Sequence, residues 1–212
     1  MQTKTISDRQ LAYRFLKNIP WLTLFISITS VIVYFLTENT GHDSAFALKL
    51  KKDTLNSGLM FDANRPLNLF GLTAFSSFFL HSNSEHLFSN LFWLNIVGVI
   101  AERKDRLKFL IALGIGHLSA LTGGIIAHRY YAASADMAGM SGGIVALALY
   151  WLVNTQAKIS ALVFSGLFAV LMYLQGPAFT VSHGLPALSG VCLALIERKL
   201  KSPASFTPVS AK

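Results

Sequence analysis

Charged side chains are scarce in this chain of 212 residues, since Asp, Glu, Lys and Arg together make up only 13% of it. Soluble domains contain about 25% of such residues. Apolar residues account for 53% of the sequence, and the mean hydropathy is +0.51. This composition excludes an ordinary soluble globular protein and favours one that lies within a lipid bilayer.

Acidic residues and cysteine are also few. The 10 acidic residues are outnumbered by 18 basic ones, which gives a net charge of +8. The basic residues lie at the ends of apolar stretches and not in one patch, so they predict membrane topology rather than nucleic-acid binding. The single cysteine, Cys192, excludes an intrachain disulfide and gives no information about the redox compartment.

Long uncharged windows divide the chain into candidate membrane spans, because a helix needs about 20 apolar residues to cross a bilayer. The last window is too long for one helix, and Gln175-Gly176-Pro177 predicts a turn within it. The sequence therefore predicts an all-α membrane protein with six transmembrane helices. The windows are 18–38, whose last residue is Glu38, and 86–101, 109–128, 137–157 and 159–196, which contain no charged residue.

The loop after the first span is nearly fifty residues long, and a loop of that length in a compact bundle is usually functional or structured. It contains a short apolar segment, Asn68 to Leu80, of about 13 residues, too few to cross a bilayer. We expect this segment to insert only partly into the membrane and to bury its backbone against the protein.

Basic residues predict the orientation. Of the 18 lysines and arginines, 13 lie on the side of the two termini and five lie in the opposite loops. Cytoplasmic loops carry the excess of basic residues, so we expect both termini in the cytoplasm. The predicted organisation is a basic cytoplasmic tail at 1–18, a membrane domain at 19–198 and a disordered cytoplasmic tail at 199–212.

Polar side chains recur at one depth in three of the predicted spans. Near their outer ends, span two carries His86 and Asn90, span four Ser141 and span six His183. Polar groups inside a membrane are costly and are functional candidates. His86 and Asn90 are four residues apart and so lie on one helix face. A plainer explanation also exists for each residue, because small and polar residues often only pack or hydrogen-bond between helices.

These side chains suit acyl transfer. A histidine can remove the proton of a serine hydroxyl near neutral pH, and an imidazole and a carboxamide can donate to a tetrahedral oxyanion. Neither Glu197 nor Asp136 is placed to orient His183, so we expect a Ser-His dyad. His117 and His128 have no matching partner in this pattern, and we expect them to be structural.

Three motifs resemble those of rhomboid intramembrane serine proteases. GMSGG at Gly139–Gly143 resembles their G-x-S-G nucleophile motif, and HSNSEHLFSN at His81–Asn90 resembles their H-x4-H-x3-N pattern. His183 opens the sixth span and is followed seven residues later by Gly190. The resemblance covers about residues 19–198, the whole six-span core.

The resemblance implies a rhomboid-like bundle with a partly inserted first loop and without a metal or cofactor. It implies Ser141 as nucleophile, His183 as general base and acid, and oxyanion donors from the Ser141 N–H, His86 and Asn90. Glu102 resembles a family position that ties the end of span two to neighbouring backbone. Structural residues near the site would be His81, Gly139, Gly142 and Gly190.

The span-six run SHGLPALSG differs from the family pattern A-H-x-x-G-x-x-x-G by having Ser182 for alanine and Pro186 for the first spaced glycine. Proline disrupts a helix interior but is tolerated in the first turn. We therefore expect span six to begin late or to bend, which would move His183 relative to Ser141.

The predicted function is a serine endopeptidase that cleaves transmembrane segments of membrane-protein substrates near the extracytoplasmic face. Its partners would be those substrates and the lipid bilayer, with no nucleic acid. It would be a multi-pass protein of a bacterial inner membrane. The alternative is a catalytically inactive rhomboid-like protein that binds membrane clients. A small transporter is disfavoured, because the windows contain no charged residue other than Glu38 at the end of the first. A specialised sorting-type rhomboid has no distinguishing motif here.

Overall fold

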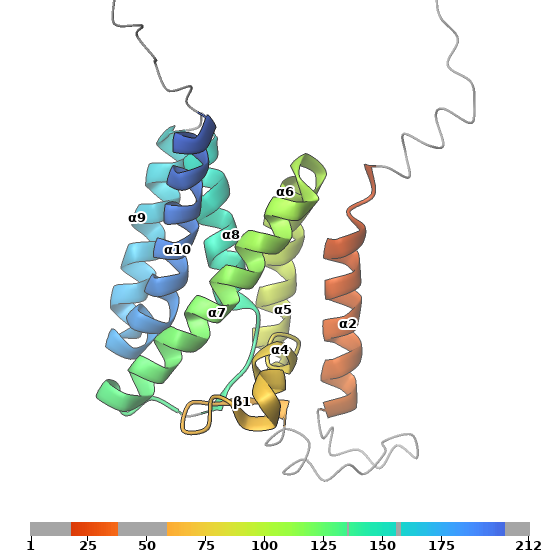
Figure 1. Ribbon diagram of the computed structural model, residues 1–212, viewed down its shortest axis with the longest axis vertical. Coiled ribbons are helices and arrows are strands. Elements are labelled where there is room, and N and C mark those ends of the chain that lie inside the picture. Colours follow the sequence, from red (N-terminus) through yellow and green to blue (C-terminus); the bar gives the residue numbers. More distant parts are fainter. Residues whose placement is uncertain (1–17, 38–58, 135, 156–157, 202–212) are drawn as a thin grey trace, which may run out of the picture.

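The computed structural model describes residues 18–37, 59–134, 136–155 and 158–201, which are mostly helical. Long helices stand side by side as a bundle, with α2 at one edge and α9 at the other (Figure 1). Residues 1–17 of the predicted tail at 1–18 and most of the tail at 199–212 lie outside the described residues, as does much of the long first loop. The start of α2 and the end of α10 lie at the same end of the bundle.

Each apolar window of the sequence contains a helix. The long elements are α2 (Trp21–Thr37), α5 (Ser84–Trp93) continued by the π-helical turn η2 (Leu94–Gly98) and α6 (Val99–Lys104), α7 (Arg106–Tyr131), α8 (Ser141–Asn154), α9 (Lys158–Gln175) and α10 (Pro177–Lys201). Among the described residues, α7 and α10 are long and apolar enough to cross a membrane, and α2 and α8 are shorter apolar helices.

Side-chain caps fix where two helices begin. Asn83 precedes α5, and its Oδ1 accepts a hydrogen bond of 2.8 Å from the backbone N–H of His86. Asp105 precedes α7 in the same way, with its Oδ1 3.1 Å from the backbone nitrogen of Lys108. Such caps satisfy N–H groups that have no partner within the helix, so the cap at Asn83 sets the facing of the residues that follow it.

The fourth apolar window begins at residue 137, but α8 begins only at Ser141. The residues before it are drawn into a short antiparallel pair of strands, β1 (Phe61–Asp62) and β2 (Asp136–Met137). Gly139 then takes a positive φ of 101°, which strains any residue with a side chain. The uncharged window therefore overestimated the length of the helix. The strand pairing that shortens the helix joins segments far apart in the sequence, and a local window does not record it.

The short apolar segment of the first loop is helical. It forms the 3-10 helix η1 (Asn68–Gly71) and α4 (Leu72–Ser76), near the end of the bundle where α2 ends (Figure 1). Leu72 and Phe75 are exposed, whereas Thr73 and Ser77 are buried. The segment thus has an apolar outer face and a polar face turned toward the protein.

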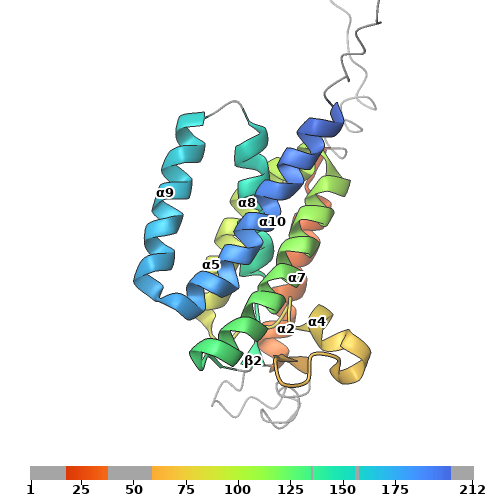
Figure 2. The same cartoon turned by 60° about the vertical axis from the view of Figure 1, so that its left-hand side comes forward.

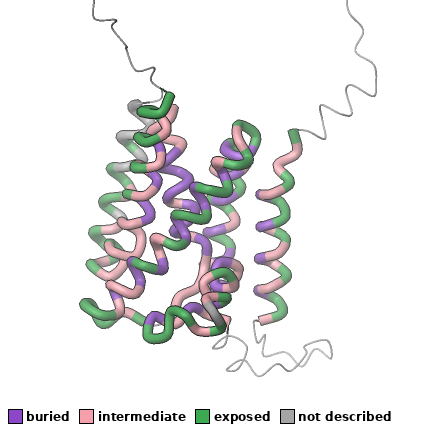
Figure 3. The backbone as a smooth tube through the Cα atoms, viewed as in Figure 1, coloured by how far each residue is buried: buried purple, intermediate pink, exposed green. Residues whose placement is uncertain are grey.

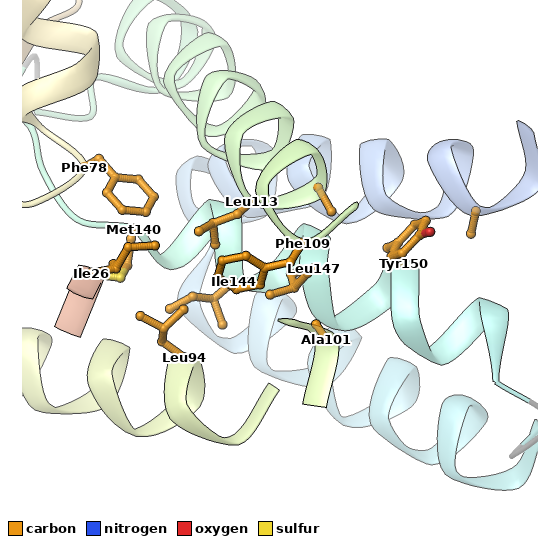
Figure 4. Packing of buried hydrophobic residues seen from close by; sticks show 12 residues of the cluster. Ile26, Phe78, Leu94, Ala101, Phe109, Leu113, Met140, Ile144, Leu147 and Tyr150 are labelled. Carbon is orange, nitrogen blue, oxygen red and sulfur yellow. The ribbon is translucent and has the colours of Figure 1, made fainter. Parts of the chain in front are cut away.

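The core lies where α7, α8 and α10 cross (Figure 2). Purple segments in Figure 3 mark buried residues along these helices, and Figure 4 shows Phe109, Leu113, Ile144 and Leu147 packed together between them. By contrast, no α9 residue whose side chain is described is buried. The bundle thus has a tightly packed centre and a loosely attached outer helix.

Small residues allow the close approach of these helices, as is usual between helices in lipid. A Cβ added at Gly143 would lie 2.6 Å from the carbonyl oxygen of Leu113 in α7. One added at Gly190 in α10 would lie 2.9 Å from the backbone of Ala146 in α8. Both distances are too short for a real contact, so Gly143 and Gly190 are required by packing.

Pro186 does not delay the start of the last helix, and the expectation that span six begins late is wrong. Helix α10 begins at Pro177 and includes Pro186 in its interior. The proline ring is buried against α8, where a Cβ on Gly142 would lie 3.2 Å from Pro186 Cγ. This packing offsets the cost of the backbone N–H that proline lacks.

At the end of the bundle where α2 begins, the buried carboxylate of Glu102 and the half-buried carboxylate of Glu197 join the helices. The two oxygens of Glu102 accept hydrogen bonds from the backbone N–H groups of Leu22 and Thr23, at 2.9 and 2.8 Å. This contact confirms that Glu102 ties the end of its helix to neighbouring backbone. Nearby, Glu197 in α10 contacts Lys108, Tyr150 and Lys201.

Candidate active site

Ser141 and His183 lie together in the structure. Ser141 is the first residue of α8, and its Oγ is 3.1 Å from Nε2 of His183 in α10. The expected displacement of His183 by Pro186 is therefore wrong. A serine hydroxyl within hydrogen-bond reach of an imidazole nitrogen is the arrangement that activates a serine nucleophile.

The imidazole of His183 also has contacts on its other sides. Its Nδ1 is 3.0 Å from the hydroxyl of Ser182, which in turn is 3.1 Å from the carbonyl oxygen of Phe179. The ring of Phe179 stacks on the imidazole, with 3.9 Å between centroids and 16° between planes. The search of the sequence for a group that orients His183 considered only carboxylates and so missed Ser182. Phe179 lies four residues before His183, and this spacing puts both on one helix face. The contact of Phe179 with the imidazole could therefore have been predicted from the sequence.

His86 and Asn90 both face the backbone of Gly139, two residues before Ser141. A Cβ added at Gly139 would lie 2.8 Å from His86 Nε2 and 3.1 Å from Asn90 Nδ2. Asn90 is buried, and its Nδ2 has no hydrogen-bond partner among the described residues. His86 Nδ1 contacts the hydroxyl of Ser82 at 3.2 Å, which leaves Nε2 toward Gly139. Two side-chain donors are thus directed at the loop that carries Ser141.

The remaining predicted residues lie around this group. His81 is buried, its Nδ1 is 3.1 Å from the carbonyl oxygen of Phe79, and its ring meets the ring of His86 edge to face at 5.2 Å. Gly142 packs against Ala120 of α7 and, as above, against Pro186. Gly142 and Gly190 contact other helices, so they serve the packing of the helices.

The family model described as Rhomboid domain matches residues 71–199, which is more than half of the chain. The chain belongs to the rhomboid family. Rhomboids are generally intramembrane serine proteases, although some members are inactive, and this chain is accordingly an integral membrane protein. All the predicted site residues fall within the matched region, whereas α2 precedes it. A search of curated proteins found no match.

In this rhomboid a second serine and histidine lie close together, but they form a brace. His117 Nε2 is 2.8 Å from the carbonyl oxygen of Ala74 and 3.4 Å from Ser77 Oγ. A carbonyl only accepts, so Nε2 carries the proton and cannot act as a base toward Ser77. His117 therefore has partners that the sequence analysis did not foresee, although its structural assignment agrees with this geometry.

This brace connects to the loop that carries Ser141. The carbonyl oxygen of Ser77 accepts a 2.8 Å hydrogen bond from the backbone N–H of Gly139. His117 thereby holds the α4 segment, and the α4 segment holds Gly139. His128 makes comparable contacts at the end of α7, with the carbonyl oxygen of Ala133 at 2.8 Å and Asn64 Oδ1 at 3.1 Å.

A cleft of about 440 Å³ opens beside the hydroxyl of Ser141. Its lining combines side chains of β2, α7 and the first turns of α10 with the loop before α8; it includes Met60, His117, Met137, Ser141, Phe179 and His183. Within the described part of the chain, no group of three or more His, Cys, Asp or Glu residues is placed to hold a metal ion. The arrangement can therefore offer a nucleophile, a base and hydrogen-bond donors to a bound peptide.

Proposed function

We propose that this rhomboid is an active intramembrane serine endopeptidase with Ser141 as nucleophile and His183 as general base and acid. The observation that carries the proposal is the 3.1 Å contact between Ser141 Oγ and His183 Nε2, beside a cleft of about 440 Å³. The substrates would be transmembrane segments of other membrane proteins, cleaved near the extracytoplasmic face. No metal or cofactor takes part in the proposed reaction.

In the acylation half of the reaction, Ser141 Oγ attacks the scissile carbonyl carbon while its proton passes to His183 Nε2. The carbonyl oxygen becomes an oxyanion, which the backbone N–H of Ser141 and the side chains of His86 and Asn90 would stabilise. The unpartnered Nδ2 of Asn90 supports this role, because a buried donor without an acceptor is costly unless a ligand supplies one. The C–N bond then breaks, and His183 donates its proton to the departing amine.

In the deacylation half, water attacks the acyl-enzyme as His183 Nε2 accepts one of its protons. The ester bond to Ser141 breaks and His183 returns the proton to Ser141 Oγ, so the enzyme is restored and the net reaction consumes one water. The same oxyanion donors serve both halves of the reaction.

We further propose that the long helices make six membrane crossings with both termini in the cytoplasm of a bacterial inner membrane. Basic residues support this orientation. Arg103, Lys104, Arg106 and Lys108, with Arg198, Lys199 and Lys201, gather at the end where α10 finishes, whereas Arg65 and Arg129 lie at the other end. Alkaline phosphatase should be inactive when fused after Lys212 and active when fused after Ser134. The reverse pattern would contradict the orientation.

Labelling with a fluorophosphonate tests the proposed nucleophile directly. We expect the detergent-solubilised protein to form one adduct, mapped to Ser141 by mass spectrometry, and we expect Ser141→Ala and His183→Ala to prevent it. Ser119→Ala, which removes another half-buried hydroxyl from α7, is the matched control and should label normally. A correctly inserted protein that neither labels nor cleaves a model transmembrane substrate would instead be an inactive rhomboid that binds clients.

A further inference from the structure

Whether His183 can serve as a base toward Ser141 depends on which of its two ring nitrogens carries the hydrogen. A neutral imidazole has one nitrogen that donates and one that accepts. His183 can receive the proton of Ser141 only if Nε2 is the accepting nitrogen, and Nδ1 must then carry the hydrogen. The groups around Nδ1 therefore bear directly on the reaction.

The hydroxyl of Ser182 lies 3.0 Å from Nδ1 of His183 and 3.1 Å from the carbonyl oxygen of Phe179. In one arrangement Ser182 donates to that carbonyl, accepts from Nδ1 and leaves Nε2 free to accept from Ser141. All three short contacts are then hydrogen bonds. In the other arrangement Ser182 donates to Nδ1, and the contact with the carbonyl joins two acceptors.

The first arrangement is favoured because it satisfies every polar atom of the group, whereas the second leaves two oxygens facing each other at 3.1 Å. We propose that Ser182 is a positioning residue that holds His183 in the tautomer able to accept the proton of Ser141. The inference rests on the proposed function and deepens it. Ser182 itself neither gains nor loses a proton during the reaction.

The stacked ring of Phe179 adds a second constraint. Its plane lies 16° from that of the imidazole, so partial rotation of the His183 ring about its Cβ–Cγ bond would break the stack. The hydroxyl of Ser182 sets which nitrogen carries the hydrogen, and Phe179 holds the plane of the ring. Together they orient the imidazole as a carboxylate does in a three-residue catalytic group, with a neutral partner in place of a charged one.

The test compares Ser182→Ala with Ser189→Ala in the intact membrane protein. Ser189 is the matched control, because it lies on the same helix and also donates to the carbonyl three residues earlier, that of Pro186, at 2.8 Å. Kinetic constants are measured with a model transmembrane substrate, together with the rate of fluorophosphonate labelling of Ser141. Thermal unfolding of each variant monitors folding.

We expect Ser182→Ala to lower kcat and the labelling rate about 10-fold, the worth of one neutral hydrogen bond, with KM unchanged. Ser189→Ala should have no such effect. Ser182→Thr, which keeps the hydroxyl, should restore both rates. Alanine favours the helical conformation, so we expect Ser182→Ala to fold.

Four results would overturn the inference. Wild-type kcat in Ser182→Ala would mean that Nδ1 is held without Ser182. Equal losses in Ser182→Ala and Ser182→Thr, or a change confined to KM, would mean that Ser182 acts by packing. These three results would leave the proposed function standing, whereas a wild-type protein that neither labels nor cleaves would overturn the proposed function and this inference with it.

Discussion

The carboxylates at one end of the bundle and the donor beside Ser141 at the other end differ in how fully they are paired. At the end where α2 begins, the carboxylate of Glu102 is matched by two backbone N–H groups, and the half-buried carboxylate of Glu197 is matched by three side chains. At the end that carries Ser141, the buried Nδ2 of Asn90 faces Gly139 and has no partner among the described residues. Within the described part of the chain, unpartnered buried polar atoms also occur at the first end, where they are Thr23 Oγ1, Trp151 Nε1 and Asn154 Nδ2.

Glu102 and Asn90 illustrate a group that stabilises the fold and a group that is available for chemistry. A satisfied buried carboxylate holds helices together, and removing it leaves unpaired donors behind. An unsatisfied buried donor costs free energy in the resting protein but can bind a charge that develops in a transition state. Substitutions of Glu102 and Asn90 should therefore have opposite signatures in stability and in activity.

The largest effect is expected from the two residues of the proposed dyad. Ser141→Ala and His183→Ala should each abolish cleavage of a model transmembrane substrate, because either removes the activated nucleophile. The double variant should be hardly worse than either single variant, since the two residues act as a unit. Thermal unfolding in detergent should change little. Cleavage at the wild-type rate by Ser141→Ala would contradict the assignment.

Asn90→Ala should lower kcat by about 10²–10³, as is typical for the loss of one oxyanion donor. The same substitution should not lower the melting temperature, because it removes a buried donor that has no partner to lose. His86→Ala is expected to reduce turnover similarly, and both variants should still label slowly with a fluorophosphonate. A large loss of stability with unchanged turnover in Asn90→Ala would reverse the comparison of the two ends.

Glu102→Ala should have the opposite signature. It removes two short hydrogen bonds to the buried start of α2, so we expect a loss of roughly 2–5 kcal/mol in unfolding free energy. The fraction that remains folded should turn over substrate normally. Arg103→Ala is the control from the same helix end, because its side chain contacts the exposed backbone carbonyl of Asn18. Equal stability of the two variants would contradict the role of Glu102.

The smallest effect concerns the cap of α7. The backbone N–H of Lys108 holds the pKa of Asp105 below its usual value, and the Lys108 ammonium acts in the same direction. The cap therefore contributes stability above about pH 4, which is lost as the pH falls through the lowered pKa. Asp105→Asn keeps the accepting oxygen but not the charge.

Wild type should consequently be more stable than Asp105→Asn by up to about 1 kcal/mol at pH 6, and the gap should close toward pH 3. Thermal unfolding of both proteins at the two pH values measures the gap. A gap that stays constant with pH would show that the charge of Asp105 contributes nothing to the cap.

Much of the bundle could be predicted because membrane spans leave a local record in the sequence. Runs without charge predicted the approximate positions of the helices. The four-residue spacing of His86 and Asn90 predicted that they lie on one helix face. The pairing of Ser141 with His183 followed from depth and from the rhomboid motifs. The start of α8 was placed too early, because the pairing of β1 with β2 depends on a segment about 75 residues away in the chain.

Contacts that depend on tertiary packing could not be read from the sequence. Pro186 was expected to disturb α10, but the glycine that receives its ring lies on another helix. The partners of His117 are a carbonyl and a hydroxyl in the first loop, which carry no pattern of their own. From the sequence, Ser182 was only a difference from the family pattern. Which nitrogen of His183 its hydroxyl contacts depends on the positions of both side chains, and these are known only from the structure.

The π-helical turn η2, between α5 and α6, has a consequence for insertions and deletions. His86 and Asn90 precede it and Glu102 follows it. A π-turn holds one residue more than an α-turn, whereas each residue of an α-helix rotates the chain by about 100°. Deleting one residue within η2 would therefore leave a regular α-turn and keep His86, Asn90 and Glu102 on their present faces. Deleting one residue from the α-helical part between Asn90 and Glu102 would instead turn Glu102 away from α2 and leave the oxyanion donors in place. The π-turn is thus the position in this helix at which the chain can shorten by one residue and still anchor α2.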